Sequence, residues 1–203
     1  MRKKVVAGLA VLFVLISGGI FYMVNLQKTS SGLDVKEEKL IKHGFRLLEE
    51  QLATYIKEHY SGVNKIEFSP IFIQGGKDNP PFTADILPVV YDEEGNRAVF
   101  GTLIGNTGYA SYGIPYSIFL DFDADDKESI LLRNSIKEQI EVADKEKLPD
   151  EVKLTSNPAI DDNIKALVDD SQLKNVIKSE TGSPKAEINY NLEIKRGSYL
   201  EWK

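Results

Sequence analysis

An apolar run without a single charge occupies residues 5–24, VVAGLAVLFVLISGGIFYMV. Twenty residues of α-helix extend about 30 Å, which matches the hydrocarbon core of a bilayer. Three basic residues (2–4) precede the run, and Lys28 is the first charge after it. Because Lys and Arg are enriched on the cytoplasmic side of such segments, residues 1–26 are predicted to form a cytoplasmic tip and a single-pass anchor. The N-terminus would then lie in the cytoplasm and the rest of the chain outside the cell.

A cleaved signal peptide is the alternative interpretation of the same run. Ser17 and Gly19 have the small-residue spacing of a cleavage site, so the body would be secreted after a cut near Gly19. Both interpretations export the body. The chain has no cysteine, which excludes disulfides, thiolate metal sites and a lipid-bearing cysteine. These features together indicate a Gram-positive-type cell envelope.

The exported part is predicted to be one α+β domain, residues 37–203, joined to the anchor by a spacer, residues 27–36. Its clearest element is a helix that should end near Ser61-Gly62. Apolar residues recur there at helical spacing: Ile41, Phe45, Leu48, Leu52, Tyr55 and Ile56. The stripe covers too few heptads for a coiled coil, so we expect the helix to pack on a sheet.

Hairpin-linked strands are predicted to follow this helix. The predicted strands are residues 65–73 (interrupted at Pro70), 84–91, 97–104 and 115–122, with Gly95-Asn96 forming the turn of a hairpin. Helices are predicted over 126–143 and 161–178, and a last strand over 186–194. The order predicts an α+β fold with a mainly antiparallel sheet, two further helices and a C-terminal strand added to the sheet.

The stretch LDFDADDKES, residues 120–129, is the most acidic in the chain. An EF-hand is disfavoured, because Asp126 and Leu132 stand where the loop needs glycine and glutamate. The favoured interpretation is a strand end followed by a helix cap at Asp125 or Asp126. A weak calcium site at Asp121, Asp123 and Asp125 is an alternative. Paired catalytic carboxylates drawn from these acids, as in a glycan hydrolase, are another.

A glycine-rich connection, residues 105–116, carries three tyrosines that are candidate binding residues: Tyr109, Tyr112 and Tyr116. They would present an aromatic platform to an envelope protein or a glycan. The alternative is that these tyrosines cover one edge of the core. The loop over residues 74–82 is a second candidate surface. His43 and His59 are separated by about 24 Å along one helix, so they cannot share a metal or a substrate.

The stretch LLEEQLATYIKEHYSGVNKIEF, residues 47–68, resembles the start of small exported or membrane-anchored proteins of Gram-positive bacteria. In these proteins an amphipathic helix is followed by an antiparallel sheet. The resemblance covers about the first third of the chain, counting the anchor. It implies the compartment and a helix-on-sheet fold, but no catalytic residue, because the group has no assigned activity. Many members are lipoproteins, whereas this chain lacks the lipid-bearing cysteine.

The sequence thus predicts a membrane-anchored extracytoplasmic binding or interaction protein without an evident catalytic centre or cofactor. It would contact the membrane through residues 5–24 and an envelope protein or glycan through its loops. A nucleic-acid partner is disfavoured, because the net charge of −6 repels phosphates. A carboxylate-dependent envelope hydrolase and a calcium-stabilised surface domain remain the alternatives.

Overall fold

The computed structural model describes residues 29–76, 79–101 and 103–202. The predicted anchor, residues 5–24, lies outside the described residues. In the part of the chain that is described, no helix is both long and apolar enough to cross a membrane. The chain divides into two units, Met1–Lys39 and Leu40–Lys203, and all of the described strands belong to the second.

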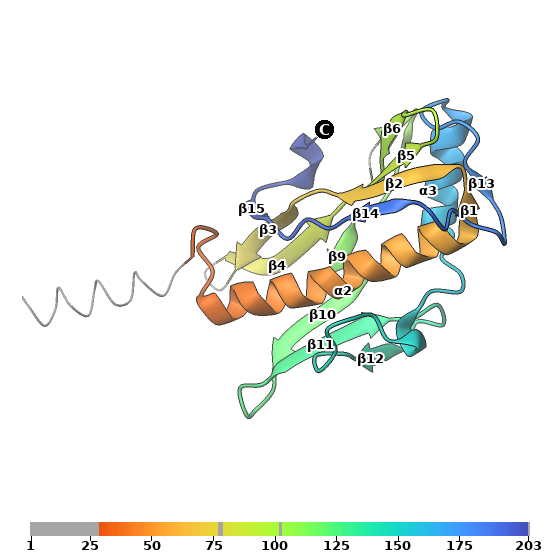
Figure 1. Ribbon diagram of the computed structural model, residues 1–203. Coiled ribbons are helices and arrows are strands. Elements are labelled where there is room, and N and C mark those ends of the chain that lie inside the picture. Colours follow the sequence, from red (N-terminus) through yellow and green to blue (C-terminus); the bar gives the residue numbers. More distant parts are fainter. Residues whose placement is uncertain (1–28, 77–78, 102, 203) are drawn as a thin grey trace, which may run out of the picture. The chain divides into compact units, whose positions relative to one another are not determined.

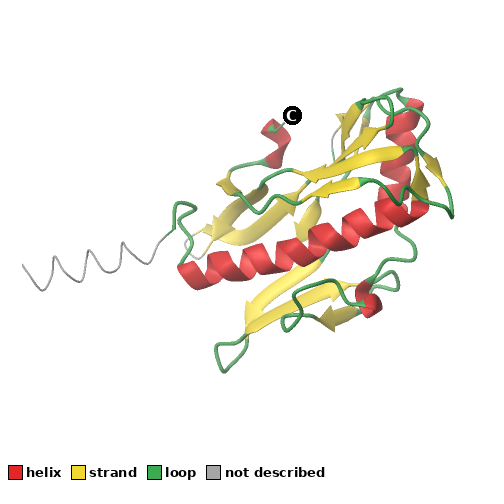
Figure 2. Cartoon of the chain, in the orientation of Figure 1, coloured by secondary structure: helices red, strands yellow, loops and turns green. Residues whose placement is uncertain are grey.

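The described residues fold as an α+β protein with mostly antiparallel sheets, as predicted (Figures 1 and 2). The helices are α2 (Val35–His59), α3 (Pro158–Asp169) and the 3-10 helices η1 (Asp150–Val152) and η2 (Tyr199–Glu201). The strands are β1 (Tyr60–Ser61), β2 (Val63–Phe68), β3 (Ile71–Gly76), β4 (Asn79–Ile86), β5 (Pro88–Asp92), β6 (Arg97–Val99), β7 (Leu103–Ile104), β8 (Thr107–Gly108), β9 (Tyr112–Ile114), β10 (Ile118–Phe122), β11 (Glu128–Arg133), β12 (Gln139–Glu141), β13 (Ile177–Lys178), β14 (Glu187–Asn189) and β15 (Ile194–Arg196).

The predicted first helix is confirmed as α2, which begins with a reciprocal cap. The N–H of Glu37 donates to Asp34 Oδ1 at 2.8 Å, and the N–H of Asp34 donates to Glu37 Oε2 at 3.1 Å. This arrangement satisfies two backbone donors that a helix N-terminus leaves unpaired. The helix ends at His59, slightly earlier than predicted.

Two four-stranded sheets continue one another beside α2. Their strand orders are β14-β2-β5-β6 and β15-β3-β4-β9. Along the chain β2 leads into β3, β4 into β5 and β14 into β15, each across a short break. The pairs β14–β2 and β15–β3 are parallel, and the others are antiparallel. The C-terminal strand therefore joins the sheet as expected, but in two pieces.

The predicted interruption at Pro70 is also confirmed, because β2 ends at Phe68 and β3 begins at Ile71. Proline has no N–H to donate to a sheet. The fully buried Ser69 continues the pairing instead. Its N–H donates to the carbonyl of Leu87, and the N–H of Leu87 donates to Ser69 Oγ, both at 2.9 Å. The buried backbone groups thus stay paired across the break.

The hairpin predicted at Gly95-Asn96 joins β5 to β6. The turn is organised by the buried carboxylate of Asp92. This carboxylate accepts hydrogen bonds from the backbone N–H groups of Glu94, Asn96 and Lys174 and from the side-chain amide of Asn96. Burial alone would raise the pKa of Asp92, but these hydrogen bonds lower it overall.

A third antiparallel sheet, β10-β11-β12, stands where a helix over 126–143 was predicted. That prediction is wrong. Ile136 is 73% exposed, although it has helical spacing from Leu132, whereas Ile130 and Leu132 are fully buried at the two-residue spacing of a strand. Residues with positive φ turn the chain before and after β11, at Asp126 (61°) and Lys137 (66°).

The helix predicted over 161–178 is present only in its first half. The helix α3 begins at Pro158, and Asn157 Oδ1 accepts a hydrogen bond from the N–H of Ile160 at 3.2 Å. Asparagine before a proline is a strong helix start. The helix ends at Asp169, and the chain continues to β13, which pairs with β1.

From Leu40 onward, α2 is buried on most of its circumference. Its buried residues are Leu40, Ile41, Gly44, Phe45, Leu47, Leu48, Glu49, Gln51, Leu52, Ala53, Tyr55 and Ile56. Figure 1 shows why: α2 runs between the β10-β11-β12 sheet and the strands β2 and β14. Gly44 marks the closest approach, because a Cβ there would lie 2.5 Å from Leu120 Cδ2 and 2.9 Å from Ile118 Cδ1. The inner face of β10 is therefore pressed against the helix.

Candidate functional site

The acidic stretch forms the turn between β10 and β11. Asp123 Oδ1 accepts hydrogen bonds from the N–H groups of Asp125 and Lys127, each at 2.9 Å. Asp121 Oδ1 accepts one from the N–H of Phe122 at 2.8 Å. The predicted cap at Asp125 or Asp126 is wrong, because a strand follows and not a helix. Among the described residues, no group of three or more His, Asp or Glu side chains is placed to hold a metal ion.

The two histidines of α2 make separate contacts. His43 Nδ1 lies 3.1 Å from Glu128 Oε2, and its Nε2 lies 2.8 Å from the carbonyl oxygen of Lys145. His59 stacks on Tyr55 with ring centroids 4.4 Å apart. His43 therefore ties α2 to the β10-β11-β12 sheet, while His59 packs at the opposite end of the helix.

The three candidate tyrosines differ in exposure. Tyr116 is 77% exposed, Tyr109 is half-buried and Tyr112 is buried, at 5%. Burial and the nearby charge of Asp161 raise the pKa of Tyr112. The pKa of Lys165 is raised chiefly by Asp169, with a smaller contribution from Tyr109. Tyr109 and Tyr112 thus lie towards α3, and Tyr116 is the most accessible ring of the three.

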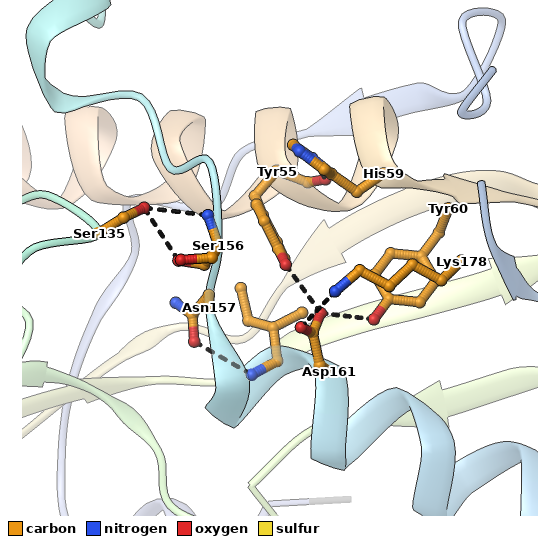
Figure 3. Close-up of polar contacts among 9 residues, drawn as sticks. Tyr55, His59, Tyr60, Ser135, Ser156, Asn157, Asp161 and Lys178 are labelled. Atoms are coloured by element: carbon orange, nitrogen blue, oxygen red, sulfur yellow. Dashed lines mark hydrogen bonds and ion pairs between the residues drawn. The ribbon is translucent and has the colours of Figure 1, made fainter. Parts of the chain in front are cut away.

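A polar cluster that the sequence did not predict surrounds Asp161, in the first turn of α3 (Figure 3). Its Oδ1 accepts hydrogen bonds from the hydroxyls of Tyr55 at 2.8 Å and Tyr60 at 2.6 Å. Its Oδ2 pairs with Lys178 Nζ at 2.5 Å. Tyr55 comes from α2, Tyr60 from β1 and Lys178 from β13, so one carboxylate joins four elements.

The electrostatics of this cluster favour an ionised carboxylate. Burial alone would raise the pKa of Asp161, but the hydrogen bonds from Lys178, Tyr60 and Tyr55 lower it overall. The pKa values of Tyr55 and Tyr60 are raised, first by burial and then by the bond to Asp161. A carboxylate with three donors and a lowered pKa is a structural junction and a poor general base, because three of its about four acceptor positions are occupied.

Removing single tyrosine hydroxyls is expected to have opposite effects at two positions. The hydroxyl of Tyr112 has no hydrogen-bond partner in the part of the chain that is described. Tyr112→Phe should therefore raise the free energy of unfolding by about 1 kcal/mol, because an unpaired buried polar group is removed. Tyr60→Phe should lower it by about 1–3 kcal/mol, because a bond to a charged group is lost. Urea unfolding of both variants measures the difference, and a destabilised Tyr112→Phe would contradict it.

A second carboxylate, Glu49 on α2, is completely buried. Its Oε2 accepts a hydrogen bond from the N–H of Asn191 at 3.0 Å, whereas its Oε1 has no partner among the described residues. Burial raises the pKa of Glu49 to about 8, against the smaller opposing effects of Asn191 and Arg46. Glu49 was not among the residues predicted to be buried, although it stands four residues after Phe45 and seven before Ile56, at the edge of the apolar stripe.

A shallow hollow of about 420 Å³ lies at the end of α2. Its lining residues are Thr54, Lys57, Glu58, Glu180, Thr181 and Pro184. The 179–184 segment closes on the end of the helix, since the N–H of Ser183 donates to the carbonyl of Lys57 at 2.7 Å. The lining is polar and carries both signs of charge. It contains none of the tyrosines or acids that the sequence indicated.

Large apolar side chains are exposed on and beside the β10-β11-β12 sheet. Ile118 and Leu120 of β10 face α2, so Phe119 between them projects from the other side, which we call the outer face. Phe119 is 42% exposed and lies opposite the half-buried Leu131 of β11. Tyr116 precedes β10 and Ile136 follows β11, at 77% and 73% exposure. Because β10 and β11 are antiparallel, both lie towards the same end of the sheet.

No family model matches the chain, and no curated protein or solved structure is detectably similar to it.

Proposed function

We propose that the chain is a membrane-anchored, extracytoplasmic binding or interaction module of a Gram-positive-type cell envelope. In this proposal residues 5–24 hold it in the membrane, and the domain that follows binds a partner without performing a reaction. The uncharged run, its basic N-terminal flank and the lack of cysteine support the compartment.

The exposed apolar side chains of Tyr116, Phe119 and Ile136 are the observation that carries the binding role. All three lie towards one end of the β10-β11-β12 sheet. Exposed apolar groups that lie near one another commonly mark an interaction site, and aromatic residues are enriched at interfaces. The strand that carries Phe119 is also held in place, because its inner face packs on α2. A rigid surface binds at a smaller entropic cost than a loop that must be ordered. Tyr116 is one of the residues that the sequence already indicated.

Capture of a partner from envelope extract tests this proposal, with the full-length chain in phosphatidylcholine nanodiscs as bait. Tyr116→Ser and Phe119→Ser should each reduce capture about tenfold, as expected for aromatic residues near the centre of an interface. Leu200→Ser is the matched control, because Leu200 is 72% exposed but lies on η2. Equal capture by all three variants would contradict the proposal.

The same experiment, run with calcium and with a chelator, shows whether recognition depends on calcium bound by the acidic turn between β10 and β11. Capture that is equal in both conditions is expected from a surface that binds through apolar contacts. Capture that requires calcium would instead assign the recognition to Asp121, Asp123 and Asp125, and Asn substitutions at these positions would then abolish it.

A further inference from the structure

We infer that the partner of the outer face of the β10-β11-β12 sheet is a basic protein segment with apolar side chains. This inference rests on the proposed binding function and specifies the chemistry of the partner. It follows from the residues that lie side by side on that face.

The apolar centre of the face is a cross-strand pair, Phe119 and Leu131. Side chains directly opposite one another on neighbouring strands form one continuous patch. Tyr116 and Ile136 extend the exposed apolar surface at one end of the sheet. A partner must therefore offer apolar side chains to cover this patch.

Carboxylates border the same patch. Asp121 lies two residues after Phe119 and so on the same face, and Glu141 lies opposite Leu131. In the part of the chain that is described, Asp121 and Asp123 form no ion pair, and they accept hydrogen bonds only from backbone N–H groups. Their negative charge is therefore available to a partner.

Residues 116–146, which include the whole β10-β11-β12 sheet, also carry a net negative charge. Residues 116–146 contain nine acids and four Lys or Arg, a net charge of −5 in 31 residues, whereas the other 144 residues of 29–203 together also carry −5. The negative charge is thus densest in the segment that carries the exposed apolar patch. A cationic partner would be attracted to this surface from a distance and held in register by it.

Other occupants fit this surface less well. A second copy of the chain would bring two acidic faces together, and like charges across an interface are unfavourable. A bilayer surface with anionic lipids would be repelled for the same reason. A neutral glycan could stack on Phe119 or Tyr116, but it would make no use of the surrounding acids.

A direct binding experiment tests the inference with a defined probe. The probe is a fluorescein-labelled peptide of alternating leucine and lysine, and the comparison peptide has glutamate in place of lysine. Fluorescence anisotropy is measured with the full-length chain in phosphatidylcholine nanodiscs. The lysine peptide should bind saturably and the glutamate peptide should not. Raising the salt concentration should weaken binding, since exposed charges are screened.

Two variants separate the apolar and the charged parts of the surface. Phe119→Ser, and the double variant Asp121→Asn with Asp123→Asn, should each weaken binding of the lysine peptide about tenfold. The control neutralises two exposed acids elsewhere, Glu180→Gln with Glu187→Gln, and should leave binding within about twofold. The melting temperature of every variant is measured, so that loss of folding is not mistaken for loss of binding.

Several results would overturn the inference. If the control variant loses as much affinity for the lysine peptide as the Asp121 and Asp123 variant does, the peptide is attracted unspecifically to an acidic protein. No effect of the Asp121 and Asp123 substitutions, or binding of a soluble peptidoglycan fragment in place of the peptide, would exclude a basic partner. In both of these cases Phe119→Ser would still reduce capture from extract, so the proposed binding function would stand. If Phe119→Ser affects neither assay, the proposed function fails together with the inference.

Discussion

Asp161→Ala is expected to lower the free energy of unfolding by about 3–5 kcal/mol, which is a large part of the stability of an ordinary domain. The substitution leaves the hydroxyls of Tyr55 and Tyr60 without an acceptor in a place where both residues are almost fully buried. It also leaves Lys178 without its partner, although this contributes less because Lys178 is half exposed. Because Asp161 joins four elements, repacking of neighbouring side chains cannot easily restore the lost stability.

A graded series of variants tests this explanation. Asp161→Asn keeps an acceptor for the tyrosines and loses only the charge, so it should cost less than Asp161→Ala. Asp162→Ala is the matched control: its side chain is exposed in the same turn of α3, and its loss should change stability by about 0.5 kcal/mol or less. Urea unfolding at neutral pH gives the order, and similar values for Asp161→Ala and Asp162→Ala would refute it.

The pH dependence of this contribution has a definite sign. The pKa of Asp161 is lower in the folded protein than in the unfolded chain. The stabilisation is therefore complete above the usual pKa range of an aspartate and is lost as the pH falls through the lower folded value. The difference in stability between the wild type and Asp161→Ala should accordingly shrink in acid.

Local patterns predicted the elements whose geometry is set by neighbouring residues. The apolar stripe of residues 41–56 predicted α2, Gly95-Asn96 predicted the β5–β6 hairpin and Pro70 predicted the break between β2 and β3. In each case the physical cause lies within a few residues of the element, so it can be read from the sequence.

The prediction of a helix over 126–143 failed because the apolar residues of this segment fit both the helical and the strand period. Apolar residues at 132, 136 and 140 have helical spacing, but Ile130 and Leu132 also have strand spacing. The turn-forming residues on both sides of β11 favour a short strand between two turns. In the turn before β11, Asp123 Oδ1 accepts a hydrogen bond from a backbone N–H group. In the turn after β11, Asn134 Oδ1 accepts hydrogen bonds from the N–H groups of Ile136 and Glu138.

The Asp161 cluster could not be predicted from spacing at all. Its members stand at positions 55, 60, 161 and 178, and only the tertiary fold brings them together. The tyrosines of the 105–116 connection show the same limit. Tyr112 and Tyr116 look equivalent in the sequence, but one lies in the core and the other in solvent, because β9 pairs with β4 and Tyr116 falls after that pairing ends.

The stability of the wild-type protein is expected to fall by about 4 kcal/mol between pH 4.5 and pH 8 through the titration of Glu49 alone. The pKa of Glu49 is about 8 in the folded protein, against 4.5 as the ordinary value. A carboxyl group whose folded pKa is raised binds its proton more tightly in the folded state. Its contribution is therefore fully present below about pH 4.5 and is lost as the pH rises through the folded value, at roughly 1.4 kcal/mol per pH unit.

Glu49→Gln isolates this effect from every other titrating group. Glutamine has nearly the same shape, keeps an acceptor for the N–H of Asn191 and carries no charge to bury. The variant should match the wild type within about 1 kcal/mol at pH 5 and exceed it by several kcal/mol at pH 9. Glu58→Gln, at an exposed position on the same helix, is the control and should follow the wild type at every pH.

The shape of the difference between the two curves is the deciding observation. Urea unfolding from pH 5 to pH 9 gives the free energy of each variant, and the difference should grow steadily and level off near pH 8. Parallel curves for the wild type and Glu49→Gln would mean that Glu49 ionises without a penalty. Its unpartnered Oε1 would then have to be solvated at neutral pH, and the packing of α2 against the 190–193 segment would have to open to admit water.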